Sequence, residues 1–219
     1  MLKRFILILA SLASFASLAS LGMALPAYAA GIDEGIEYLL VSPPVRTANE
    51  EKIEVVEMFW YGCPHCYQFE PKLNAWRKNL PANVEFVRIP AVFDKRRNWE
   101  LHARAYYTAE LLGVLDKIHG PLFKAIHEKK EKLFTKETLA DFFAKQGVDK
   151  KEFLDTLYSF GVGMKVARAI DLTSRYGIDG VPTVVINGRY RTHASLTNGQ
   201  AGMLKVMDFL INKEANASK

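Results

Sequence analysis

The sequence predicts an α/β fold in which a block of helices interrupts a strand-containing domain. Two strand-like runs rich in Val, Ile and Phe, at residues 52–60 and 84–89, flank a helical pattern. Two further strand-like runs occur only near the C-terminus, at 183–186 and 189–192, and another helical pattern follows them. Between residues 98 and 176 apolar residues recur at helical spacing alone.

The first 29 residues have the features of a secretion signal. Lys3 and Arg4 precede an uncharged stretch, and Ala27-Tyr28-Ala29 has the small-x-small pattern that signal peptidase cleaves. We therefore predict a signal peptide over residues 1–29, cleaved after Ala29, and an exported protein that functions in a bacterial periplasm. The alternative is an uncleaved anchor, because the uncharged stretch is long enough to span a bilayer.

Charge and length of the mature chain indicate one domain without a nucleic-acid partner. The 219 residues carry a formal net charge of +5, which falls to +3 when Lys3 and Arg4 are removed. The run from 127 to 132 mixes both signs and is typical of a solvated helix face. The remaining chain is long enough for one sizeable core, and we expect a monomer.

The first half of the strand-containing domain should begin with a short strand at 38–41, stopped by Pro43-Pro44. A central strand over 52–60 leads into a helix over 64–79. Pro64 suits the first helical turn, where its missing N–H is not needed, and Pro71 is expected to kink the helix. The next strand is predicted at 84–89.

The block that follows should contain five helices, at 99–114, 121–127, 136–145, 150–158 and 164–176. The turn signals that separate them are Gly113, Gly120, Gly147 and Gly161. Asp149 and Glu152 have the spacing of a capping box at the start of one helix.

The last two strands should form a hairpin, because Asn187-Gly188 is the preferred dipeptide for a type I′ turn. A final helix is predicted over 198–213. Without the helical block the order is βαβ followed by ββα, which is a thioredoxin-like arrangement. We therefore predict a thioredoxin-like domain formed by 30–97 and 177–219, with an all-helical insertion at 98–176.

The two cysteines, Cys63 and Cys66, lie at the predicted junction of the central strand and its helix. Three extended residues span ~10 Å, too far for a disulfide, but the first turn of a helix brings such a pair within bridging range. The helix N-terminus also favours a thiolate. The pattern predicts a reversible redox disulfide. The alternatives are an inert bridge, which would restrict so short a loop little, and a zinc site, which lacks a second Cys pair.

Several motifs together resemble the DsbA family of bacterial periplasmic thiol:disulfide interchange proteins. They are Cys63-Pro64-His65-Cys66, the following Tyr67-Gln68-Phe69-Glu70, the helical insertion and Gly180-Val181-Pro182. The resemblance covers essentially the whole mature chain. It implies a dithiol oxidase without a cofactor, which donates its disulfide to unfolded exported proteins with cysteine thiols. It also implies reoxidation by a DsbB-like quinone-linked membrane oxidase.

The resemblance assigns roles around the cysteine pair. Cys63 matches the exposed nucleophile, Cys66 its buried partner, and Pro64 and His65 the dipeptide that tunes the pair. His65 can place positive charge beside the Cys63 sulfur. The chain departs from the family's best-known member at Gly62, where that protein has an aromatic residue.

Two further positions match functional residues of the family. Val181-Pro182 matches a loop with a cis proline, whose backbone at Val181 could pair with an extended client segment. Glu57 matches a buried acid that could exchange protons with Cys66. The alternative for Glu57 is a side chain that faces water or pairs with Lys52 or Arg88. The remaining aromatic residues and histidines are assigned no chemistry, among them Trp60, Tyr61, Trp76, Tyr106, Tyr107, His102, His119, His127 and His193.

Two other functions remain open from the sequence. The first is an isomerase or reductase on the same fold, although only about twenty mature residues precede the central strand, too few for the dimerisation domain that isomerases of this compartment usually carry. The second is a metal-binding module that uses Cys63, Cys66 and His65.

Overall fold

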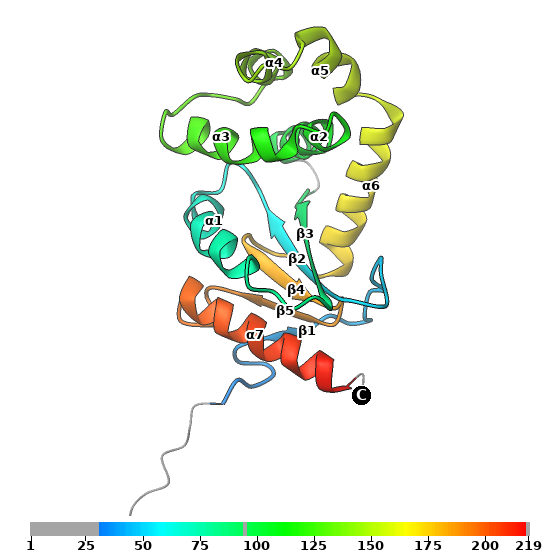
Figure 1. Ribbon diagram of the computed structural model, residues 1–219, viewed down its shortest axis with the longest axis vertical. Coiled ribbons are helices and arrows are strands. Elements are labelled where there is room, and N and C mark those ends of the chain that lie inside the picture. The colour runs from blue at the N-terminus through cyan, green and yellow to red at the C-terminus, as the bar shows by residue number, and fades with distance from the viewer. Residues whose placement is uncertain (1–30, 94–95, 218–219) are drawn as a thin grey trace, which may run out of the picture. The chain divides into compact units, whose positions relative to one another are not determined.

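A five-stranded mixed sheet forms the centre of the fold, in the order β1-β5-β4-β2-β3 (Figure 1). The computed structural model describes residues 31–93 and 96–217, so the predicted signal peptide lies outside the described residues. The strands are β1 (Leu39–Leu40), β2 (Ile53–Phe59), β3 (Val84–Pro90), β4 (Thr183–Ile186) and β5 (Tyr190–His193). β2 runs parallel to β3 and antiparallel to β4. Within the described part of the chain, no helix is both long and apolar enough to cross a membrane.

The central strand β2 is buried along its whole length, as its β-branched and apolar sequence predicts. Successive side chains of a strand point to opposite faces, and they enter different cores. Val55 packs with residues of α1 (Pro64–Arg77) and α7 (Gln200–Ala217). Val56 packs with the helices that lie between β3 and β4 in the chain. The end of β2 is therefore held from both sides, where the cysteines follow.

Five helices lie between β3 and β4 in the chain, as predicted: α2 (Arg97–Leu111), α3 (Leu115–His127), α4 (Lys136–Lys145), α5 (Lys150–Leu157) and α6 (Phe160–Arg175). The helix boundaries predicted at Gly120 and Gly161 are wrong, because both residues lie inside helices. α3 starts six residues before Pro121 because its first turns bury Ile118 in the core, and this packing outweighs local propensity. α6 starts at Phe160 because the Ser159 side chain accepts the Val162 N–H and caps it.

The helix starts elsewhere show which local signals hold. Asp149 caps α5 by accepting the Glu152 N–H at 2.8 Å. α1 continues through Pro71, while the kink stays a prediction. α7 begins at Gln200 and not at 198, because Asn198 and Gly199 both have positive φ and so cannot be helical.

The β4–β5 hairpin has the predicted turn but a different register. Asn187 and Gly188 have φ of 51° and 62°, and the Arg189 N–H donates to the Ile186 carbonyl at 3.0 Å, as in a type I′ turn. The ladder nevertheless pairs Ile186 with Tyr190, so β5 starts one residue later than predicted. Gly188 is required here, since a Cβ would lie 1.9 Å from the carbonyl oxygen of Val45.

Candidate redox site

The cysteine pair occupies the first turn of α1, as the sequence predicted. Cys63 is the N-cap residue, Pro64 is the first helical residue, and the Cys63 sulfur accepts the Cys66 N–H at 3.4 Å. Both cysteines are free thiols. Cys66 is fully buried, and Cys63 is only 7% exposed, so the expectation of an exposed Cys63 is wrong in degree. The two sulfurs therefore differ in access, and an attacking group can reach only Cys63.

The two thiols also differ in acidity. The pKa of Cys63 is lowered to about 6, first by the hydrogen bond from the Cys66 side chain and then by the backbone N–H groups of Cys66 and His65. Burial opposes this shift, and the charge of the exposed His65 ring contributes least. Burial raises the pKa of Cys66 well above that of an ordinary thiol. Near neutral pH the pair therefore holds a thiolate at Cys63 and a thiol at Cys66.

The Val181–Pro182 loop lies against the cysteines, although it is 118 residues away in the chain. The Val181–Pro182 peptide bond is cis, which confirms the prediction. In its protonated form the Cys63 thiol donates to the Val181 carbonyl, which lies 3.3 Å from the sulfur. A groove beside this loop is lined by His65, by residues 179–183 and by residues 193–195. An extended chain in this groove would lie next to the sulfur of Cys63.

Glu57 fits parts of both interpretations of the sequence, because it is a buried acid and it also pairs with Arg88. Its side chain is fully buried on β2, and its Oε2 accepts a hydrogen bond from Arg88 Nε at 2.9 Å. Its Oε1 has no hydrogen-bond partner among the described residues. Burial raises the pKa of Glu57 to about 8, against the opposing charge of Arg88. The negative charge of Glu57 in turn contributes to the raised pKa of Cys66, which places the carboxyl within electrostatic reach of the buried thiol.

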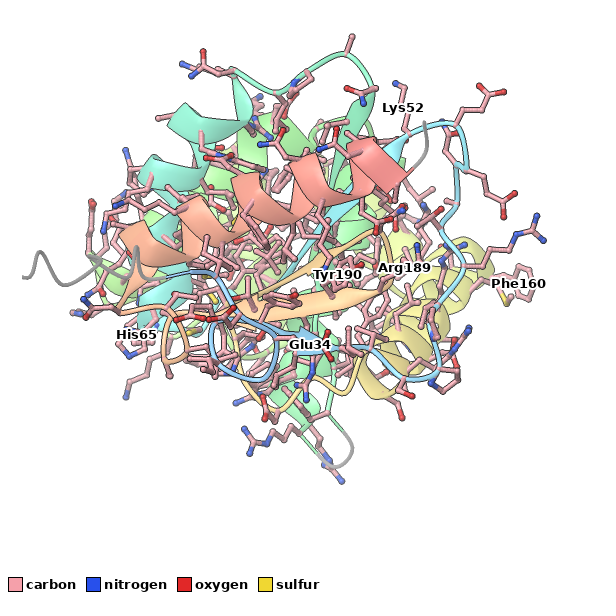
Figure 2. All side chains as sticks on the ribbon, turned by 90° about the horizontal axis from the view of Figure 1, so that it is seen from below. Glu34, Lys52, His65, Phe160, Arg189 and Tyr190 are labelled. Atoms are coloured by element: carbon pink, nitrogen blue, oxygen red, sulfur yellow. The ribbon has the colours of Figure 1, made fainter. Side chains whose placement is uncertain are left out.

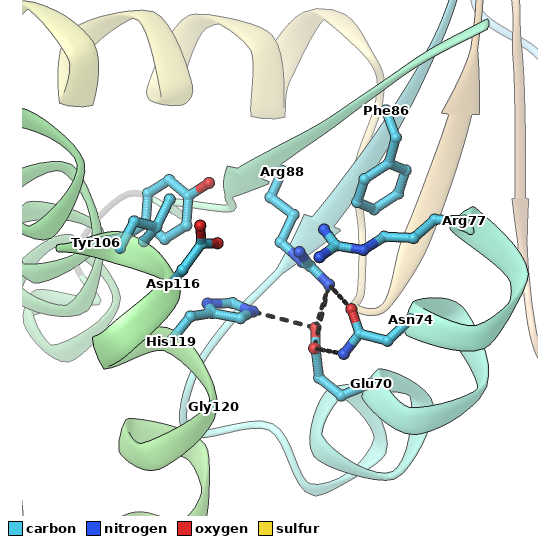
Figure 3. Close-up of a pocket in the computed structure, with 10 residues that line it drawn as sticks. Glu70, Asn74, Arg77, Phe86, Arg88, Tyr106, Asp116, His119 and Gly120 are labelled. Atoms are coloured by element: carbon cyan, nitrogen blue, oxygen red, sulfur yellow. Dashed lines mark hydrogen bonds and ion pairs between the residues drawn. The ribbon is translucent and has the colours of Figure 1, made fainter. Parts of the chain in front are cut away.

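Arg88 connects Glu57 to a buried polar network that the sequence did not reveal (Figure 3). Its guanidinium donates to both Glu70 oxygens, at 3.0 and 3.1 Å, and to Asn74 Oδ1 at 3.1 Å. Glu70 also contacts His119 Nε2 at 3.2 Å, and His119 Nδ1 lies 2.9 Å from the Tyr61 hydroxyl. Only Glu70 had a local signal, because it follows Cys66 by four residues on the same face of α1.

The protonation of this network follows from its burial. Burial lowers the pKa of His119, so its ring is neutral near pH 7. Its Nε2–H then donates to Glu70, and its Nδ1 accepts the proton of the Tyr61 hydroxyl. Burial opposes ionisation of Glu70, but its hydrogen bonds with His119 and Asn74 and the nearby positive charge, including that of Arg88, outweigh burial and lower the pKa of Glu70. Glu70 is therefore the carboxylate that keeps Arg88 paired when Glu57 is protonated.

The glycine before the first cysteine has a steric reason. A Cβ on Gly62 would lie 2.3 Å from Cζ2 of Trp60, so no larger residue fits while the indole keeps its place. That indole stacks on Trp99 of α2, with ring centroids 4.3 Å apart and an interplanar angle of 9°. In this chain the aromatic ring beside Gly62 is thus that of Trp60, two residues earlier in the sequence.

Over residues 31–93 and 96–217, no three His, Cys, Asp or Glu side chains are grouped so that they could hold a metal ion. The nearest histidine in the sequence, His65, has an exposed side chain at the surface (Figure 2).

Comparison with known proteins agrees with this geometry. The family model described as a DSBA-like thioredoxin domain matches residues 54–204. The thiol:disulfide interchange protein DsbA of Pseudomonas aeruginosa is 45% identical over 213 residues, which are 97% of this chain and 98% of that protein. DsbA of Burkholderia cepacia is 43% identical over 80% of this chain and 82% of its own length.

Solved structures give the same result for the fold. The crystal structure of Pseudomonas aeruginosa DsbA has a TM-score of 0.80 at 45% identity, covering 85% of this chain and 96% of that one. The oxidoreductase DsbA from Xylella fastidiosa has a TM-score of 0.76 at 34% identity, covering 82% of this chain and 96% of that one. The predicted thioredoxin-like class with added helices is thereby confirmed, while the residue boundaries of the two parts stay a prediction.

Proposed function

We infer the function of this chain from its family: it belongs to the DsbA family of thiol:disulfide interchange proteins, and it is a thiol:disulfide oxidoreductase. We propose that it oxidises dithiols of newly exported, unfolded proteins. The observation that supports this direction is the difference in acidity between the two thiols of one helical turn. A stabilised Cys63 thiolate favours the reduced state, so the disulfide is a strong oxidant. DsbA proteins are a known case in which a stabilised reduced form makes the disulfide oxidising.

The proposed reaction transfers two electrons from a client to the cysteine pair. A client thiolate attacks the sulfur of Cys63, the bond between the two cysteine sulfurs breaks, and Cys66 leaves and takes up a proton. A second client thiolate then attacks the client sulfur of this mixed disulfide. A disulfide forms within the client, and Cys63 leaves as a thiolate. Burial of Cys66 supports this assignment of roles, since a client can approach only Cys63.

Glu57 is the proposed proton partner of Cys66. Cys66 must gain a proton when it leaves and lose one when the disulfide is restored. A carboxyl whose pKa is raised to about 8 can hold or release a proton near neutral pH, and it is within electrostatic reach of Cys66. Pro64 and His65 are proposed to tune the pair. His65 acts mainly through its backbone N–H, with its ring charge a smaller effect.

The groove beside Val181 and Pro182 is the proposed client-binding site. Pro182 presents no N–H to the sulfurs, and backbone pairing at Val181 would bind an extended chain without reading its side chains. Such binding suits an enzyme that accepts many unfolded clients. The Val181 carbonyl oxygen lies 3.3 Å from the Cys63 sulfur, so a client segment paired with the Val181 backbone would lie beside the sulfur that its thiolate attacks.

Location and partners complete the proposal. The leader over residues 1–29 supports export to the periplasm, with cleavage after Ala29. There the protein would function as a monomer without a cofactor and be reoxidised by a DsbB-like quinone-linked membrane oxidase.

The oxidase function is tested with a reduced, unfolded substrate that contains cysteines. The oxidised wild-type protein should form substrate disulfides stoichiometrically, and failure to do so would refute the proposal. Cys66→Ser should accumulate mixed disulfides between Cys63 and clients in cell extracts, because the resolving thiol is missing. Cys63→Ser is the matched control and should form none. Adducts that appear equally in both variants would refute the assigned roles.

A further inference from the structure

A cavity of about 360 Å³ opens between α1, β3 and the start of α3, and no step of the proposed redox reaction uses it as a binding site (Figure 3). Its floor is the network of Glu70, Arg88 and His119. These three side chains are about nine-tenths buried and hydrogen-bonded to one another. The floor is thus a polar surface held in place by hydrogen bonds, and its side chains already lose most of their water when the protein folds.

Two charged side chains on the walls remain without an ion pair. Arg77, from the last turn of α1, and Asp116, from the first turn of α3, both line the cavity and are exposed. Neither belongs to any ion pair between described residues. Figure 3 shows Arg77 and Asp116 on different sides, with Arg88 between them and His119 below Asp116. The cavity therefore offers one positive and one negative group that do not neutralise each other.

The charged side chains on the floor of the cavity neutralise one another. Arg88 is paired with Glu57 and Glu70, and His119 is neutral near pH 7. A purely anionic ligand would meet Asp116 and Glu70, and a purely cationic ligand would meet Arg77 and Arg88. A small molecule that carries a carboxylate and an ammonium on the same carbon can pair with Arg77 and Asp116 together, each charged group next to a group of opposite charge.

The rest of the lining is Asn74, Gly120 and three side chains with aromatic or aliphatic surface, and the guanidinium groups of Arg77 and Arg88 lie 5.9 and 5.1 Å from the centroid of the Phe86 ring. Phe86, Tyr106 and Leu115 contribute aromatic and aliphatic surface beside the charged groups. We propose that this cavity binds a small zwitterion with an apolar side chain, namely a free amino acid such as leucine or phenylalanine. The carboxylate lies toward Arg77, the ammonium toward Asp116, and the side chain against Phe86, Tyr106 and Leu115.

Binding is tested by NMR titration of the isotope-labelled intact protein with L-leucine and L-phenylalanine. Saturable shifts should appear at the amides of residues 74–77 and 115–120. N-acetyl-leucine lacks the ammonium and leucine methyl ester lacks the carboxylate, so each should bind at least about fivefold more weakly. No saturable shift at tens of millimolar, or blocked derivatives that bind as tightly as L-leucine itself, would overturn the proposal. This comparison uses only the wild-type protein.

Variants then locate the site. Arg77→Gln and Asp116→Asn should each weaken L-leucine binding at least about fivefold. The matched controls are Lys145→Gln, in the last turn of α4, and Glu137→Gln, in the first turn of α4, which change the same kinds of helix-end charge away from the cavity. Wild-type affinity in both cavity variants would overturn the proposal. Disulfide formation is measured separately, so loss of binding and loss of the oxidase function can be told apart.

Discussion

The acidity of Cys63 depends on the thiol of Cys66 more than on the ring of His65. The hydrogen bond from Cys66 is the largest cause of the shift from 9.0 to about 6, and the His65 charge is the smallest. At pH 7 a thiol of pKa about 6 is roughly nine-tenths ionised, whereas one of pKa 9.0 is about 1% ionised. We predict that Cys66→Ala raises the pKa of Cys63 by ~1 pH unit or more, because the donor is lost while the backbone N–H groups remain.

The assay is the ultraviolet absorbance of the thiolate of the reduced protein against pH. The high pKa of Cys66 keeps its own ionisation away from the Cys63 transition. Cys66→Ser is the matched variant: its hydroxyl can still donate, so its transition should lie between those of the wild type and Cys66→Ala. His65→Ala retains the backbone N–H and should produce a smaller rise than Cys66→Ala. An unchanged transition in Cys66→Ala, or a larger rise in His65→Ala, would refute this explanation.

Three further predictions concern stability. The pKa of Cys63 is about 6 in the folded protein and 9.0 in the unfolded chain, so the Cys63 thiolate contributes its full stabilisation above pH 9 and loses it as the pH falls through about 6. The reduced protein should therefore lose stability relative to the oxidised protein over this range, with about 1 kcal/mol of this contribution remaining at pH 7. Urea unfolding of both forms checks this, and parallel pH profiles of the two free energies of unfolding would contradict it. Gly62→Ala should lower the free energy of unfolding by ~1–3 kcal/mol and change the near-ultraviolet circular dichroism, because the Trp60 indole must leave Trp99. Gly120→Ala is the control, since a Cβ there meets nothing within 4 Å, and equal effects of the two substitutions would refute the steric account. Tyr61→Phe should lower the free energy of unfolding by ~1–3 kcal/mol, because His119 Nδ1 loses its hydrogen-bond donor. Tyr158→Phe, at an exposed site, is the control and should leave stability unchanged. Wild-type stability in Tyr61→Phe would show that this hydrogen bond contributes nothing.

Much of the fold could be predicted because its signals are local. The apolar run of β2, the Asp149 cap of α5 and the Asn187-Gly188 turn depend on backbone geometry within a few residues. Local signals fail where they conflict with packing: Gly120 and Pro121 predict a helix boundary, yet they lie inside α3 because its first turns are buried. The same locality explains the cysteine pair, since Cys63 and Cys66 are one helical turn apart whatever surrounds them.

The residues around the pair were decided by tertiary structure. The resemblance to a family, and not the spacing of residues, pointed to Pro182 and Glu57. Only the folded chain shows that Val181 accepts the Cys63 thiol and that Arg88 pairs with Glu57. Tyr61 and His119 carried no signal at all, because their partners come from other elements.

By itself, the sequence predicted an export leader, and it determined a thioredoxin-like order of strands and helices and two cysteines in one helical turn. Each of these follows from composition or from spacing within a single segment. The tertiary structure alone decided which sulfur is accessible, the hydrogen bonds that separate their acidities, and the buried charges behind them. The physical reason is that burial and pairing arise between segments far apart in the chain, and desolvation and short-range electrostatics depend on those contacts and not on sequence distance.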